Sequence, residues 1–213
     1  MSPPAASVHV RRSRRRADSV RRRRIGLITF IGVVAVAVAV ALAMPLFRRA
    51  VNDLTLPLAY SDVIRQQAGE KHLDPALIAA VIYAETKFDP RPSAAGAEGL
   101  MQILPQTAEF LARRSGATTF TLADLATPQV NIAYGSYYLR YLLDHYQGQE
   151  IPALAAYNGG ETNVDRWLAQ ERAEGRPLTI GEIPYPQTQA YVEKVLHAQR
   201  SYRRTYPAAL GYS

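Results

Sequence analysis

The chain has 213 residues, which is enough for one ordinary domain with a hydrophobic core. It contains no cysteine, which excludes structural disulfides, thiolate metal sites, a cysteine nucleophile and a lipid-modified N-terminal cysteine. The net charge of +7 is of the kind found in nucleic-acid-binding proteins, but residues 1–24 hold nine arginines and one acid and account for +8. We therefore expect a nearly neutral folded part and no nucleic-acid partner; a DNA-binding arm is the less favoured interpretation of the tail.

The N-terminal region predicts a membrane anchor. Residues 1–24 lack apolar periodicity and should form a disordered, basic, cytoplasmic tail. Residues 25–44 carry no charge, and a helix of that length rises about 30 Å, the thickness of the hydrocarbon core of a bilayer. We assign residues 25–47 to a single transmembrane helix in the cytoplasmic membrane. The arginines before it place the N-terminus in the cytoplasm and the rest of the chain in the periplasm.

A cleaved signal peptide is the alternative for this region, because Ala41–Ala43 resembles a small-residue cleavage site. Apolar cores of signal peptides usually run about 7–15 residues. The apolar run here is longer, which favours an uncleaved anchor. Residues 48–59 are predicted to be a linker.

From residue 60 onward the apolar residues recur at helical spacing, and the sequence contains no convincing strand pattern. The fold class is therefore predicted to be all-α. A capping residue followed by proline marks two of the helix starts, at Pro75 and Pro128. Residues 207–213 are expected to be a short tail. Helices are expected at residues 60–70, 75–85, 105–114, 122–125, 128–146, 151–160, 162–170 and 188–206.

Glu85 is the strongest candidate for chemistry. It follows the aliphatic stripe of the helix that Asp74 caps, so its carboxyl is expected on the face that points into the core. Loss of hydration and the dipole at the end of the helix both disfavour the charged form and raise the pKa. A carboxylic acid that stays protonated near neutral pH is suited to general acid catalysis. The alternative is a glutamate that turns to solvent at a frayed helix end.

Three motifs around and after this residue resemble a known family. Glu85 and Thr86 are followed by Ser-Ala-Ala-Gly-Ala-Glu-Gly-Leu-Met-Gln at residues 93–102, and Ala-Tyr-Asn stands at residues 156–158. In this order and spacing they closely resemble the catalytic domain of soluble-type lytic transglycosylases, relatives of goose-type lysozyme. The resemblance covers about residues 60–202.

This resemblance implies a lysozyme-like fold for a catalytic domain that we place at residues 60–206. It also implies cleavage of the β-1,4 bond between N-acetylmuramic acid and N-acetylglucosamine in peptidoglycan, with formation of a 1,6-anhydro sugar. Glu85 would be the general acid and then the general base. The implied substrate-binding residues are Ser93, Met101, Gln102, Tyr157, Asn158 and Tyr191. Packing is the favoured alternative for Met101, and the Tyr157 hydroxyl can hydrogen-bond the catalytic carboxyl.

The expected partners follow from the same resemblance and from the anchor. They are peptidoglycan glycan strands and the cytoplasmic membrane, and cell-wall assembly or secretion machinery is a candidate protein partner. No cofactor is expected. No metal is expected either, because the four histidines lack ligand spacing.

The sequence departs from the family pattern in its closing segment. Where the family usually has Glu-Thr-Arg before a tyrosine, this chain has Gln187 and Gln189, which removes an ion pair there. Two other acids lie near Glu85: Asp89 is interpreted as a turn residue and Glu98 as a solvated loop residue. The alternatives to a lytic transglycosylase are a hydrolytic muramidase on the same fold and a non-catalytic wall-binding or assembly protein.

Overall fold

The structure is a computed structural model of the chain, and it describes residues 32–34, 37–41, 43–44, 56–90 and 92–212. The chain divides into two compact units, residues 1–54 and 55–213. In the first unit the three short described pieces are helical. The predicted tail, most of the predicted anchor and most of the predicted linker lie outside the described residues. Within the described residues, no helix is both long and apolar enough to cross a membrane.

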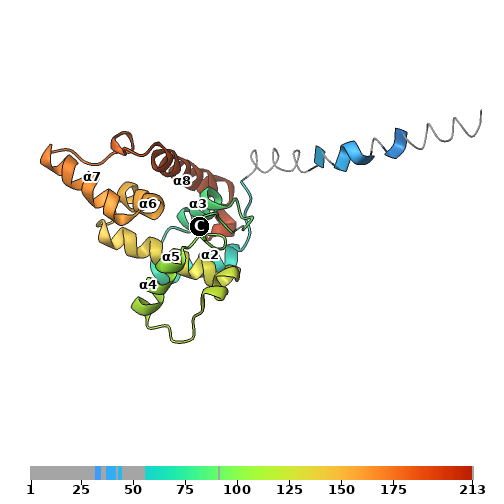
Figure 1. The fold of residues 1–213 in the computed structure, drawn as a ribbon, viewed down its shortest axis with the longest axis horizontal. Coiled ribbons are helices and arrows are strands. Elements are labelled where there is room, and N and C mark those ends of the chain that lie inside the picture. Colours follow the sequence, from blue (N-terminus) through green and yellow to red (C-terminus); the bar gives the residue numbers. More distant parts are fainter. Residues whose placement is uncertain (1–31, 35–36, 42, 45–55, 91, 213) are drawn as a thin grey trace, which may run out of the picture. The chain divides into compact units, whose positions relative to one another are not determined.

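The second unit consists of helices joined by loops (Figure 1). The β structure in its described residues is one isolated antiparallel bridge, between Glu98 and Ile103. The all-α prediction is therefore confirmed. The helices are α2 (Ser61–Lys71), α3 (Pro75–Glu85), α4 (Pro105–Ser115), η1 (Leu122–Ala126), α5 (Pro128–His145), α6 (Glu150–Gly159), α7 (Glu161–Ala173), η2 (Ile180–Glu182), α8 (Pro186–Thr205) and α9 (Pro207–Leu210).

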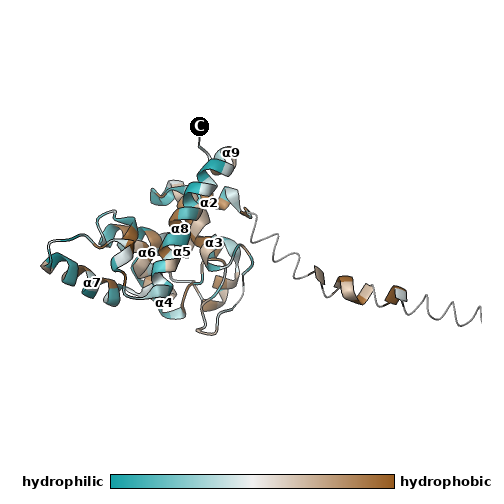
Figure 2. Cartoon of the chain, turned by 90° about the horizontal axis from the view of Figure 1, so that it is seen from above, coloured by the Kyte–Doolittle hydropathy of each residue, from teal (hydrophilic) through white to brown (hydrophobic). Residues whose placement is uncertain are grey.

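Helix α3 lies in the core of this unit. Asp74 caps it as predicted, because its side chain accepts a hydrogen bond from the backbone N–H of Ala76 at 3.0 Å. Every residue from 76 to 82 is buried, whereas the sequence predicted a single buried stripe. The helix is apolar all round, which suits a helix that both α8 and α2 pack against, and Figure 2 draws it mostly in hydrophobic colours, in contrast to α7.

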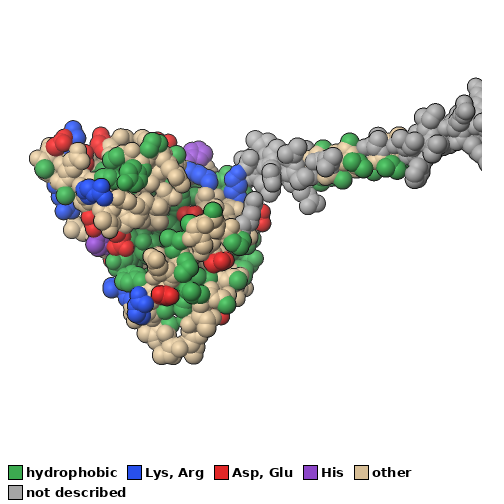
Figure 3. Space-filling view, viewed as in Figure 1, with side chains coloured by type: hydrophobic (Ala, Val, Ile, Leu, Met, Phe, Trp, Pro, Cys, Tyr) green, Lys and Arg blue, Asp and Glu red, His purple; other side chains and the backbone are tan. Residues whose placement is uncertain are grey.

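Helix α8 is the main neighbour of α3, and the contact between these two helices is more extensive than that between any other pair of helices in the described residues. One of its faces is buried and carries Tyr191, Val195 and Tyr202, which recur at spacings of four and seven residues. The opposite face is exposed and carries Glu193 and Arg200. On the face of the unit seen in Figure 3, charged side chains of both signs are interspersed.

Both ends of the described second unit are attached to its helices. The carbonyls of Leu56 and Pro57 accept hydrogen bonds from the hydroxyls of Tyr206 and Tyr202, each at 2.6 Å. At the other end, residues 207–213 were predicted to be a tail, but they include α9, and Leu210 is 1% exposed. The short helix arises because Pro207 is suited to a first helical position and an apolar side chain follows it.

Candidate active site

Glu85 is the last residue of α3, and the helix ends there for a local reason. The two residues that follow Thr86 have left-handed backbones, with φ of 53° at Lys87 and 63° at Phe88. The Thr86 hydroxyl donates to the carbonyl of Leu100 at 2.8 Å and so links this helix end to the loop at residues 93–102. The helix therefore stops before Pro90 is reached, and the glutamate is held at a fixed helix end.

The surroundings of Glu85 favour its protonated form. The side chain is half-buried, and burial raises the pKa of its carboxyl to about 7 against the lowering effects of the Tyr191 hydroxyl and the Lys194 charge. The predicted direction of this pKa shift is confirmed. Near neutral pH both the acid and the carboxylate are populated, which is the condition for a group that must donate a proton and later accept one.

Tyr157, on α6, brings its hydroxyl close to this carboxyl. Burial and then the negative charge of Glu85 raise the pKa of the hydroxyl well above its usual value. The hydroxyl donates its hydrogen to the Met101 carbonyl at 2.9 Å. The sequence had suggested a hydrogen bond from Tyr157 to the catalytic carboxyl instead. Because the hydroxyl hydrogen is already donated to Met101, the Tyr157 oxygen can only accept a hydrogen bond from Glu85, which requires a protonated Glu85 carboxyl.

Tyr191, on α8, also interacts with this carboxyl. Its side chain is 8% exposed, and its buried hydroxyl meets no group in ideal hydrogen-bond geometry within the described part of the chain. The hydroxyl nevertheless interacts with the Glu85 carboxyl, and burial, followed by that charge, raises the Tyr191 pKa well above its usual value. Glu85, Tyr157 and Tyr191 thus come together from three different helices.

Ser93 and Gln102 shape the loop between α3 and α4. The Ser93 hydroxyl oxygen accepts a hydrogen bond from the backbone N–H of Ala97 at 2.8 Å. The Gln102 side chain donates to the carbonyl of Gly99 at 2.8 Å, and its own backbone is left-handed with φ of 50°. In this structure both residues hold the loop in shape, whereas the sequence proposed them as substrate contacts.

The Met101 side chain does not line a substrate groove, as its place among the implied binding residues would require; it is 0% exposed and packs where Gly135 lacks a side chain, which is the favoured alternative from the sequence. A Cβ at Gly135 would lie 2.4 Å from the Met101 sulfur. The thioether is thus part of the core, and it is the Met101 carbonyl that takes part in the site, through Tyr157.

Asn158 joins α6 to α8. Its side-chain oxygen accepts a hydrogen bond from the Thr188 hydroxyl at 3.0 Å. Gly159 follows it, and a Cβ there would lie 3.0 Å from the Thr188 hydroxyl oxygen, so α6 and α8 approach closely at this point. The amide group of Asn158 retains hydrogen-bonding capacity beyond this single bond.

Comparison with known families assigns the chain that carries this site to a family. Residues 62–179 match the family described as the Transglycosylase SLT domain. The chain belongs to the SLT domain family. In the described part of this SLT domain, no group of three or more His, Cys, Asp or Glu residues is placed to hold a metal ion.

Known proteins resemble this SLT chain over the same region. The soluble lytic murein transglycosylases of Escherichia coli K12 and Salmonella typhimurium LT2 are 31% and 32% identical to it, each over 150 residues and 69% of the chain. The match covers 23% of each relative, so the chain spans about a quarter of the length of these proteins.

Solved structures agree with the family assignment. An inactive Glu→Gln mutant of the lytic transglycosylase Slt from Pseudomonas aeruginosa superimposes with a TM-score of 0.67 at 31% identity, covering 73% of this chain and 26% of that one. The 70 kDa soluble lytic transglycosylase of E. coli gives 0.66 at 30% identity, covering 70% and 25%. The same kind of enzyme has been solved in complex with bulgecin A. The predicted lysozyme-like SLT fold is thereby confirmed.

Asn131, on α5, is a residue of the SLT domain that sequence reasoning missed. It is 0% exposed; its amide donates to the carbonyls of Glu98 and Leu125, and its oxygen accepts from the N–H of Met101 at 2.8 Å. Gly99 has to be glycine because a Cβ there would lie 2.1 Å from the Asn131 amide nitrogen. The signal was present in the sequence: a polar residue four positions before Gly135, on a helix face that is otherwise apolar.

Lys194 was missed as well. It follows Tyr191 by three positions, so the two side chains lie on the same part of α8. Its ammonium group donates to the carbonyl of Ala84 at 2.7 Å, next to Glu85 in the chain. The sequence pattern of α8 marks this lysine only as a polar residue beside a buried face.

Proposed function

We propose that the chain is a peptidoglycan lytic transglycosylase that cleaves the β-1,4 bond between N-acetylmuramic acid and N-acetylglucosamine. The observation that carries the proposal is a half-buried glutamate with a pKa near 7 that interacts with the hydroxyls of Tyr157 and Tyr191. Membership of the SLT family supports it, as do the relatives named murein transglycosylases. The inactivity of the Glu→Gln mutant of the P. aeruginosa relative supports a glutamate as the acting group.

In the proposed reaction the protonated Glu85 donates its proton to the bridging oxygen, and the bond from that oxygen to C1 of the muramoyl sugar breaks. Glu85, now a carboxylate, accepts the proton of the C6 hydroxyl of the same sugar, and O6 bonds to C1 to close a 1,6-anhydro ring. No water is consumed, and the glutamate ends in its starting state.

One carboxyl is sufficient for this chemistry. Hydrolytic glycosidases use two carboxyls, placed about 5 to 9 Å apart. Here the nucleophile is a hydroxyl already held on the sugar ring, so no second carboxylate has to activate a water molecule. Tyr157 and Tyr191 would hold the Glu85 carboxyl in place between the two proton transfers, and Asn158 would bind an N-acetyl group with its remaining amide capacity.

The test is digestion of purified sacculi by the full-length chain in detergent, followed by mass spectrometry of the released muropeptides. Anhydro-muropeptides are expected from the wild type and none from Glu85→Gln. Products with a reducing end would identify a hydrolytic muramidase instead. Binding to sacculi without release of any product would identify a wall-binding protein.

We further propose that the enzyme is attached to the cytoplasmic membrane through residues 25–47 and acts in the periplasm. The support is the charge-free apolar run and the excess of arginines before it. Alkaline carbonate extraction of membranes should leave the chain in the pellet, and protease added to spheroplasts should digest the SLT domain. Recovery of a shorter, carbonate-soluble form would indicate a cleaved signal peptide.

A further inference from the structure

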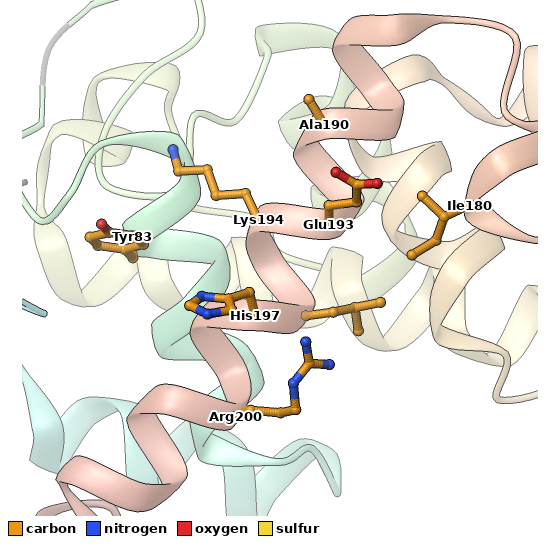
Figure 4. Close-up of a pocket in the computed structure, with 8 residues that line it drawn as sticks. Tyr83, Ile180, Ala190, Glu193, Lys194, His197 and Arg200 are labelled. Carbon is orange, nitrogen blue, oxygen red and sulfur yellow. The ribbon is translucent and has the colours of Figure 1, made fainter.

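A cleft of about 600 Å³ runs along the exposed side of α8, and Lys194 stands at its edge toward α3 (Figure 4). The Lys194 side chain crosses from α8 to α3, where its ammonium group lies 2.7 Å from the Ala84 carbonyl oxygen and 5.5 Å from the centre of the Tyr83 ring. Glu193 points to the other side of the cleft, toward Ile180.

We propose that Lys194 is a positioning residue for Glu85: it holds the end of α3 in place and sets the pH range in which the glutamate can donate its proton. The inference rests on the proposed transglycosylase function. Lys194 does not have to touch the sugar, because it acts through the helix end and through its charge.

The first part of the argument is the backbone. The last carbonyls of a helix have no partner within the helix, and a lysine placed there can supply one. At this helix end the Ile82 and Tyr83 carbonyls accept hydrogen bonds from the backbone N–H groups of Thr86 and Lys87. The Ala84 carbonyl accepts a hydrogen bond from the Lys194 ammonium group. This bond is made one residue before Glu85, so the position of the catalytic carboxyl depends on it.

The second part is charge. The groups that affect the Glu85 carboxyl come from two helices: Tyr157 from α6, and Tyr191 and Lys194 from α8. Both tyrosines are neutral at working pH because their pKa values are raised, so within the described residues Lys194 supplies the charge that acts on this carboxyl. Lys194 itself faces the like charge of Lys87. A nearby ammonium group stabilises the carboxylate that exists between the two proton transfers.

The direction of the effect follows from the sign of the charge. Burial disfavours the carboxylate, and the Lys194 cation offsets part of this penalty. Without the cation, Glu85 would stay protonated to a higher pH, and the carboxylate needed for the second step would be less stable. Lys194→Met should therefore move the alkaline limb of the kcat profile upward by about 0.5 to 1 pH unit and lower the maximal kcat about 10-fold, with KM little changed.

The experiment compares Lys194→Met and Lys194→Arg in the full-length chain, with sacculi as substrate and anhydro-muropeptide release as the rate. Lys194→Arg keeps the charge and the donors, so it should restore the wild-type profile. Arg200→Met is the matched control, because it removes one positive charge from the exposed face of the same helix at a residue that is not among the groups acting on the Glu85 carboxyl. Its pH profile should coincide with that of the wild type.

A second measurement does not depend on activity. Carbon-13 NMR of the glutamate side-chain carboxyls, with the Glu85 signal assigned by its loss in Glu85→Gln, should show a higher pKa in Lys194→Met than in the wild type. The inference is overturned if this pKa is unchanged, or if Lys194→Met and Lys194→Arg lose kcat equally with no shift of the pH profile. An inactive wild type would overturn the proposed function alone, and the NMR titration would still decide the role of Lys194.

Discussion

The two ends of α3 carry carboxyl groups with opposite properties. Asp74, at the N-terminal end, accepts hydrogen bonds from the backbone of Ala76 and from the side chains of Tyr212, Gln199 and Arg203. Burial by itself would raise its pKa, but these four donors together lower it. Glu85, at the C-terminal end, is also partly buried, yet its pKa rises to about 7.

The difference shows what separates a structural carboxyl from a reactive one. Burial acts on both groups in the same direction, so the number of donors and the position on the helix dipole decide the outcome. Asp74 faces unpaired N–H groups at a helix N-terminus, and it stays ionised. Glu85 stands at a C-terminus, where one hydroxyl and one ammonium group oppose the effect of burial only in part.

The largest expected effect is on catalysis at the reactive end. Glu85→Gln keeps the shape of the side chain but removes the exchangeable acidic proton, so we expect activity on sacculi to fall by at least about 1,000-fold. Release of anhydro-muropeptides is the measurement. Glu98→Gln is the control, since the contacts of Glu98 with Asn131 and Ile103 are made by its backbone, and it should keep most of the activity. Residual activity near the wild-type level in Glu85→Gln would refute the assignment.

At the structural end we expect a loss of stability. Asp74→Ala removes a helix cap and the acceptor of three side-chain donors, which should lower the free energy of unfolding by on the order of 4 kcal/mol. The drop in Tm of the full-length chain measures it. Asp62→Ala, in the exposed first turn of α2, should change stability by less than about 0.5 kcal/mol. An equal effect of the two variants would show that the Asp74 network does not stabilise the fold.

The two carboxyls also predict opposite pH dependences of stability. The raised pKa of Glu85 means that its contribution is complete below pH 4.5 and is lost as the pH rises to about 7. Asp74, with its lowered pKa, contributes above pH 3.8 and loses that contribution as the pH falls further.

Glu85→Gln isolates the first of these dependences. The variant should match the wild type in stability near pH 4 and exceed it at pH 8, by at most about 3 kcal/mol. Thermal unfolding of both proteins across this pH range is the measurement. Parallel curves would mean that the native pKa of Glu85 is close to its value in the unfolded chain.

The smallest effects distinguish the two tyrosines beside Glu85. Tyr157→Phe removes a hydrogen bond and leaves the Met101 carbonyl without its partner, which should cost about 1 kcal/mol of stability. Tyr191→Phe removes a buried hydroxyl that makes no ideal hydrogen bond in the described part of the chain, so stability should change by less than about 0.5 kcal/mol. Both variants should lose activity about 10-fold. Equal stability losses in the two variants would contradict this assignment of hydrogen bonds.

The helix ends of the second unit were predictable because capping is local. A capping residue followed by proline predicted the start of α3, and Pro105 and Pro128 begin α4 and α5 as expected. The position of Glu85 at the end of an apolar helix and the direction of its pKa shift were predictable for the same reason. Helix α9 was not predicted, because a segment of four helical residues has too little periodicity to be recognised.

The partners inside the site were less predictable. Met101 is adjacent to Gln102 in a loop motif, but only the packing of Gly135 against it shows that its side chain is buried. Asn131 bonds to backbone groups up to 33 positions away in the chain, and Lys194 bonds to one 110 positions away. Helical periodicity extends over only a few residues, so it cannot predict either of these long-range hydrogen bonds.

By itself the sequence determined where helices α3, α4 and α5 begin, that the fold is all-α, and that one carboxyl is carried into the interior at the end of an apolar helix. Only the tertiary structure decided which groups face that carboxyl: two tyrosine hydroxyls and one ammonium group, from helices far along the chain. The physical reason is that helix capping and hydrophobic periodicity act over a few neighbouring residues, whereas a pKa depends on every charge and dipole nearby in space.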